Sequence, residues 1–153
     1  MPTNMNSNPR LLLSEILRKV SNAKTKKEKV ELLRKHNSNA LRQMLIINFD
    51  ESIESVMPEG EVPYTPNDAP VGTDHSRLEH EYRGLYRFFK GGDPRIKGLK
   101  RESMFVQLLE GLAADEAELV VLAKDGGINK KYKRITKAVV SEAFPQIEWG
   151  GRG

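Results

Sequence analysis

The stretch that decides the fold is residues 114–144, which read ADEAELVVLAKDGGINKKYKRITKAVVSEAF. Its first part has the composition of a helix, and Asp115 is the residue that we expect to cap it. The doublet Gly126-Gly127 breaks this helix and leads into the basic run KKYKR. Thr136 then caps a second helix. The stretch therefore predicts two helices joined by a turn with a dense positive charge.

Helix signals recur through the rest of the chain. Thr25, with Glu28 three residues later, and Ser38 are N-caps for two helices, and Asn8-Pro9 suits the start of a helix before them. Apolar residues also recur at spacings of three and four between residue 76 and the doublet Gly91-Gly92. This spacing predicts a helix that buries one face, made of Leu78, Tyr82, Leu85, Tyr86 and Phe89.

These signals predict an all-α fold, a compact bundle of about six to seven short helices with a long irregular acidic and proline-bearing loop. We expect a single domain over residues 1–153. Its parts are the N-terminal helices at 9–49, the extended loop at 50–76, the C-terminal helices at 77–145, and a tail at 146–153 that we expect to fray from Trp149 onward.

The loop at 50–76 separates the charges of the chain. It holds seven acidic residues and no Lys or Arg, whereas the remainder carries 25 basic and 14 acidic residues, a net charge of +11. Four prolines in the loop exclude a long helix or a central strand. We therefore expect an extended acidic arm that lies across a basic helical body.

The basic residues form three clusters at turns and helix ends, and each cluster alone is most simply a solvated helix face. Turns can supply flexible cations to phosphate groups, so three such clusters together favour a nucleic-acid partner. The first cluster is Lys19, Lys24, Lys26, Lys27 and Lys29. The second is Arg83, Arg87, Lys90, Arg95, Lys97, Lys100 and Arg101, and the third is Lys130, Lys131, Lys133 and Arg134 around Tyr132.

The sequence shows no catalytic motif. Without cysteine there is no thiolate nucleophile or thiolate zinc site, and no glycine-rich loop of nucleotide-binding enzymes occurs. His36, His75 and His80 lack the spacing of metal ligands, so we expect surface histidines, no cofactor, no metal and no enzyme. No apolar run is long enough to cross a membrane, so we expect no membrane partner.

The chain resembles the N-terminal, all-helical DNA-binding domain of ATP-dependent DNA ligases from tailed phages. The similar segments are 12–16, 22–33, 118–125, 135–138 and 143–145. In that family a helix–turn–helix grips the DNA backbone. The resemblance implies that the following residues lie near phosphate: Lys124, Gly127, Lys130, Lys131 and Thr136. The Lys-x-Asp-Gly nucleophile of ligases is absent, because Lys124, Asp125 and Gly126 are adjacent.

We therefore expect a non-catalytic phage accessory protein in the cytoplasm of the infected host cell or in the virion. It would bind double-stranded DNA through phosphate contacts, largely independently of sequence. The expected contacts are Lys24, Lys26, Lys27, Lys124, Gly127, Lys130, Lys131, Lys133, Arg134 and Thr136. Two alternatives stay open. The arm at 50–76 would dock a protein partner, or it would simply neutralise the protein's own basic surface.

Overall fold

The structure, a computed structural model, describes residues 11–67 and 76–150. These ranges contain seven α-helices and two 3-10 helices. No strand occurs in these ranges, which contain three isolated β-bridges. The predicted all-α bundle of short helices is confirmed. The elements are α2 (Leu13–Asn22), α3 (Lys26–Lys35), α4 (Asn39–Phe49), α5 (Leu78–Glu81), η1 (Tyr82–Phe88), α6 (Gly98–Gly111), α7 (Ala114–Lys124), η2 (Ile128–Lys130) and α8 (Lys137–Ala143).

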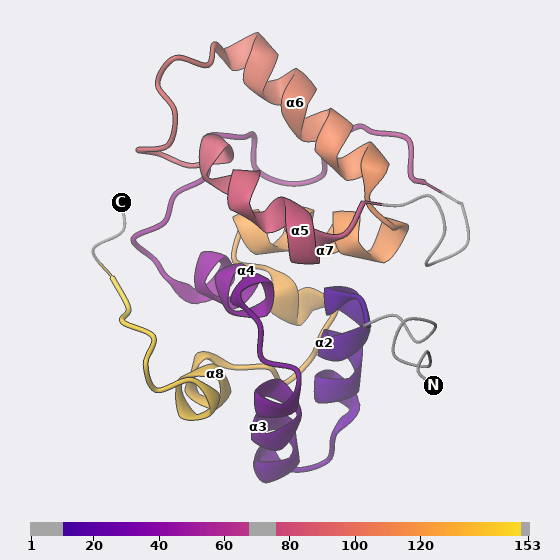
Figure 1. The fold of residues 1–153 in the computed structure, drawn as a ribbon, viewed down its shortest axis with the longest axis vertical. Coiled ribbons are helices and arrows are strands. Elements are labelled where there is room, and N and C mark those ends of the chain that lie inside the picture. Colours follow the sequence, from indigo (N-terminus) through magenta and orange to yellow (C-terminus); the bar gives the residue numbers. More distant parts are fainter. Residues whose placement is uncertain (1–10, 68–75, 151–153) are drawn as a thin grey trace, which may run out of the picture.

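Helices α4 and α7 occupy the centre of the molecule (Figure 1). On one side α3 packs against α2 and α8, and on the other α6 packs against α7 and η1. The buried apolar side chains form one cluster that draws on both sides, with Leu17, Leu33, Met44, Leu109 and Phe144 among its most buried members. This packing brings the first helices of the chain next to its last one.

Three predicted N-caps are confirmed. The side chains of Thr25, Ser38 and Thr136 accept hydrogen bonds from the backbone N–H of Glu28, Leu41 and Val139 at 3.1, 3.0 and 3.2 Å. Each bond satisfies an N–H group that the first helical turn leaves without a partner. The predicted starts of α3, α4 and α8 are therefore correct to the residue.

Of two other predicted helix starts, one differs and one lies outside the described residues. Helix α7 begins at Ala114 with Ala113 as its N-cap, so the prediction that Asp115 caps it is wrong. Asp115 lies within the first turn, where a carboxylate still favours the positive end of the helix. The first described helix begins at Leu13, and the predicted cap at Asn8-Pro9 lies outside the described residues.

A buried carboxylate that the sequence did not reveal joins the two sides of the bundle. Glu116 accepts the N–H of Leu13 at 2.9 Å with one oxygen and the N–H of Leu78 at 3.0 Å with the other. These are the first residues of α2 and α5, so one side chain caps two helices. Burial raises the pKa of the Glu116 carboxyl, and the two N–H bonds lower it in part.

The segment after residue 76 departs from the predicted helix. Only Leu78–Glu81 is α-helical, and Tyr82–Phe88 is a 3-10 helix with about three residues per turn. The tighter winding buries Leu85 and Phe88 and leaves Tyr86 54% exposed, so the prediction that Tyr86 lies on the buried face is wrong. The turn that follows requires Gly92, since an added Cβ would lie 2.1 Å from the Tyr86 carbonyl oxygen.

The loop at 50–67 is an extended segment strapped to the helices, as predicted. Its backbone exchanges hydrogen bonds with η1 and the turn after it, from Val56 N–H to Phe88 O at 3.0 Å and from Lys90 N–H to Glu54 O at 2.9 Å. Farther along, Gly60 N–H bonds to Asp125 and Thr65 N–H to Glu110, at 2.9 and 2.8 Å. Within this segment, the Met57 side chain is buried.

The described part of the tail is held against the body, so the expectation of fraying is wrong for Trp149 and Gly150. The Trp149 indole N–H donates to Ser141 Oγ at 3.1 Å, and the Lys137 ammonium lies over its ring. The next N–H, of Gly150, bonds to Asp50 at 2.9 Å. An aromatic ring with both an apolar contact and a hydrogen-bond partner anchors the end of the chain.

Candidate nucleic-acid interface

The structure places the third basic cluster beside α2, the helix that carries Lys19 of the first cluster. Ser21 Oγ, near the end of α2, donates a hydrogen bond to Lys133 O at 2.9 Å. One turn earlier, the Arg18 guanidinium donates to Lys131 O at 3.4 Å. These bonds fix the turn at 128–136 beside the end of α2 and the turn at 23–25, although more than one hundred residues separate them in the sequence.

A shallow groove of about 620 Å³ lies where the two segments meet. Its polar lining offers two guanidinium groups, an ammonium group, a hydroxyl and two amides, and no carboxylate. Such a lining favours an anion that brings several acceptor oxygens, and a phosphodiester does so. The lining residues are Arg18, Ser21, Asn22, Asn129, Lys133 and Arg134.

The basic turn owes its shape to buried anchors. Gly126 adopts a left-handed φ of 70°, and Gly127 N–H bonds back to Leu122 O at 2.8 Å, which ends α7. The amide oxygen of Asn48 then receives the N–H of Ile128 at 2.9 Å. Three buried side chains, Ile128, Tyr132 and Ile135, alternate with the basic residues and hold the turn against the core. The cations between them are consequently left at the surface.

Most of the predicted contact residues are available at this surface. Lys24, Lys27, Lys130, Lys133 and Arg134 are exposed, and none forms an ion pair within the described ranges. Lys26 is also exposed and pairs with Glu142 at 3.1 Å. A pair so open to water contributes little, so Lys26 can exchange its partner at small cost.

The structure removes two residues from the predicted set. The Lys124 ammonium is buried, with a side chain only 1% exposed, and donates to Pro58 O, Gly60 O and Asp125 Oδ2 at 2.8, 2.9 and 2.8 Å. It therefore holds the loop at 50–67 against α7 and cannot reach a phosphate. Gly127 is likewise buried, and its N–H is used within the end of α7.

Two further predicted residues are partly engaged. The Lys131 ammonium bonds to Asp115 and Glu118 on α7. Burial lowers the pKa of Lys131, but the hydrogen bonds to Glu118 and Asp115 outweigh it and raise the pKa overall. The Thr136 hydroxyl is exposed, and its oxygen caps α8. Neither side chain is as free to meet a phosphate as Lys133 or Arg134.

The aromatic residue in the basic run lies inside the protein. Tyr132 is 1% exposed, and the Arg18 guanidinium covers its ring at 4.9 Å. Burial accordingly raises the pKa of the Tyr132 hydroxyl. Because no aromatic face is open here, the groove can contact a sugar–phosphate backbone but cannot stack on a base.

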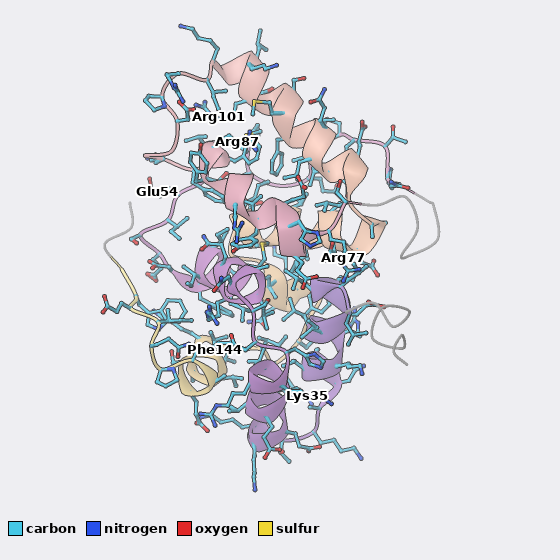
Figure 2. The ribbon with its side chains drawn as sticks, viewed as in Figure 1. Lys35, Glu54, Arg77, Arg87, Arg101 and Phe144 are labelled. Carbon is cyan, nitrogen blue, oxygen red and sulfur yellow. The ribbon has the colours of Figure 1, made fainter. Side chains whose placement is uncertain are left out.

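The second basic cluster lies apart from the groove. Figure 2 shows Arg87 and Arg101 together at the α6 end and Lys35 on α3 at the other end. The Arg101 guanidinium donates hydrogen bonds to the backbone carbonyls of Arg87, Asp93 and Ile96, at 2.9, 3.1 and 2.8 Å. Arg101 belongs to α6, and so does Lys100. The three clusters therefore do not form one surface.

The sequence analysis missed four groove residues: Arg18, Ser21, Asn22 and Asn129. The first three carried a signal, because positions i, i+3 and i+4 share one face of a helix. Asn129 carried none, since its position depends on how the turn is anchored to α4.

Other kinds of site were sought in the described ranges. They hold no group of three or more His, Asp or Glu side chains able to hold a metal ion, and His75 lies outside them. Their longest helix, α6, has 14 residues, and no described helix is both long and apolar enough to span a bilayer.

A comparison with protein families gives one match, to residues 16–130, by a family of unknown function (DUF6433). The chain belongs to this family. The DUF6433 match runs from α2 to η2, so it takes in the α2 side of the groove and Asn129 and ends before Lys133 and Arg134. No curated protein and no solved structure matches the chain.

Proposed function

We propose that this protein binds double-stranded DNA through its phosphates at the groove between α2 and the turn at 128–136, without catalysis and largely independently of sequence. One observation carries the proposal. The third basic cluster is joined to α2, from a distant part of the chain, by the Ser21–Lys133 and Arg18–Lys131 hydrogen bonds, and Arg18, Lys133 and Arg134 line a groove with no acidic residue.

The charge arrangement supports contact with a polyanion. A solvated helix face is normally balanced by acidic neighbours, as Lys131 is balanced by Asp115 and Glu118. Lys133 and Arg134 have no such partner in the described ranges, and Arg18 covers Tyr132 and bonds to a backbone carbonyl. Cations left unpaired at a concave surface attract phosphate and release counterions when it binds.

The form of the ligand follows from what the groove lacks. Base reading in a duplex needs a helix or a pair of strands that enters a DNA groove with side chains on the base edges. Here the cations lie on a turn and on the edge of a shallow hollow, which suits backbone contact. The buried Tyr132 removes the stacking platform that a single strand would use. A duplex, bound by its phosphates, fits both facts.

The accessory-protein role, and a place in the host cytoplasm or the virion, belong to the same proposal. They rest on the resemblance to the DNA-binding domain of phage ligases together with the absence of the ligase nucleophile.

The test is a titration of a fluorescent duplex with two charge-matched variants. Lys133→Gln with Arg134→Gln removes two groove cations, and we expect a loss of affinity of roughly 10- to 30-fold at low salt. Lys97→Gln with Lys100→Gln removes the same charge at the α6 end and should leave the affinity nearly unchanged. Equal losses in both variants would show only a general effect of charge, and the groove would then have no special role.

The alternative, a protein partner that docks on the arm at 50–76, keeps one supporting observation. Glu59 and Glu61 are exposed on the described part of this segment. The backbone around them is bonded to α7, so the segment would present a fixed acidic edge rather than a free arm.

The same two acids decide whether the arm competes with DNA. Deleting the loop would also remove the acceptors of Lys124, so the sharper variant is Glu59→Gln with Glu61→Gln. An increase in duplex affinity for this variant would support competition. Capture of a protein that survives nuclease treatment and is lost in the variant would support docking.

A further inference from the structure

A second surface, at the α6 end, differs from the groove in one respect: its aromatic ring is open. Tyr86 on η1 is 54% exposed. Elsewhere Arg18, Arg83, Arg87 and Lys137 cover the rings of Tyr132, Tyr82, Phe88 and Trp149. No cation lies over the Tyr86 ring, and its hydroxyl makes no hydrogen bond within the described ranges.

Tyr86 is part of the wall of a hollow of about 230 Å³ between η1, α4 and the loop at 50–67. The other walls are apolar, from Ile47, Ile53 and Phe89. Gln43 and Lys90 also line the hollow, and no hydrogen bond of the Gln43 side chain occurs in the described part of the chain. Binding hollows for small flat ligands have this composition, mostly apolar with a few polar groups that fix orientation.

Cations stand around this hollow. Lys90 lines it and forms an exposed ion pair with Glu54. Arg95 lies within electrostatic reach of Tyr86 and is held by Asp93 through two hydrogen bonds of 3.0 Å. Arg83 is exposed one turn before Tyr86. The Lys90–Glu54 pair is open to water on both sides, and such a pair yields readily to a stronger anion such as phosphate.

We propose that this hollow binds a base of a single-stranded nucleic acid. The Tyr86 ring stacks on the base, the Gln43 amide bonds to its edge, and Lys90 with Arg83 holds the adjoining phosphates. An apolar slot alone would suit many partners, whereas an open aromatic face beside an amide and several cations matches the parts of a nucleotide. The site is separate from the groove, so it stands or falls independently of duplex binding.

The experiment compares two probes on the full-length protein: a fluorescent oligothymidylate of about 12 nucleotides and a duplex of similar length. Tyr86→Ala should weaken single-strand binding by roughly 5- to 100-fold, since stacking on one aromatic ring contributes about 1–3 kcal/mol. Tyr86→Phe keeps the ring and should bind like the wild type. Duplex affinity should be unchanged in both.

Three controls keep the test decisive. Lys133→Gln with Arg134→Gln should weaken the duplex far more than the single strand, which separates this site from the groove. Gln43→Ala should lower single-strand affinity by a few-fold, and a thermal melt of each variant confirms that it is folded. The proposal is overturned if the wild type does not bind the single strand at low salt. It is also overturned if Tyr86→Phe loses as much affinity as folded Tyr86→Ala.

Discussion

The two ends of the molecule carry similar positive charge but use it differently. At the groove, Tyr132 is buried beneath Arg18 and the cations around it are exposed. At the α6 end, Tyr86 is exposed, and the Arg101 guanidinium is hydrogen-bonded to three backbone carbonyls. A count of basic residues does not reveal this difference. The structure shows that what each cation already bonds to decides which charges can meet a ligand.

The same contrast occurs within one short stretch. Lys124 and Lys133 are nine positions apart in the segment with the densest charge. The ammonium of Lys124 is inside the protein with three acceptors, and that of Lys133 is at the surface without an acidic partner in the described ranges. Charge density along the sequence thus combines structural and ligand-facing residues, and only tertiary contacts separate them.

The largest expected effect comes from Lys124→Met. This variant tests whether Lys124, unlike Lys133, has a structural role rather than a role in the interface. Removing the ammonium leaves Asp125, Pro58 O and Gly60 O without their donor, and breaking such a buried pair costs about 3 kcal/mol of unfolding free energy. We expect a lower midpoint in urea and duplex affinity close to wild type in the folded state. A large loss of affinity with little change in stability would return Lys124 to the interface.

A slightly smaller effect is expected at Glu116, which joins the two ends. In Glu116→Ala the N–H groups of Leu13 and Leu78 lose their acceptor inside the protein, at a cost of about 2 to 3 kcal/mol. Glu116→Gln retains one carbonyl oxygen as an acceptor, so we expect it to lose only about half as much unfolding free energy as Glu116→Ala. Chemical denaturation of both variants measures the difference. Equal stability of the two would mean that the double cap does not connect α2 and α5 in the way described.

The smallest effect is expected for Ser21→Ala, which sharpens the account of the groove. The substitution removes the hydrogen bond to Lys133 O but no charge, and it should cost about 1 kcal/mol of stability. Because the turn is then held less firmly, we expect duplex affinity to fall by about 2- to 3-fold. Asn22→Ala, whose side chain lines the groove without holding the turn, is the matched control. An equal effect of the two would place the role of Ser21 in direct contact with the ligand.

Local chemistry explains how much of the fold the sequence predicted. Thr25, Ser38 and Thr136 act on N–H groups three residues away, so their roles as caps could be read directly. The Tyr86 face could not, because the 3-10 winding after Glu81 depends on packing and on the close fit of Gly92. Glu116 and Lys124 bond to residues 38 to 103 positions away, and no local pattern announces such partners.

The candidate site divides in the same way. The exposed cations of the turn and of residues 24–27 were predicted from composition alone. That the turn lies beside α2 was not predicted, since it follows from tertiary packing and from the Ser21 bond.

The central claim is that the groove cations, rather than positive charge in general, hold duplex phosphates. Its most direct test is the slope of log affinity against log salt for duplex binding. With five exposed cations engaged, the wild type should give a slope between about −4 and −5, and Lys133→Gln with Arg134→Gln should reduce its size by about 2. Lys97→Gln with Lys100→Gln should leave it unchanged. A slope that is the same in both variants, or binding that does not respond to salt, would contradict the account.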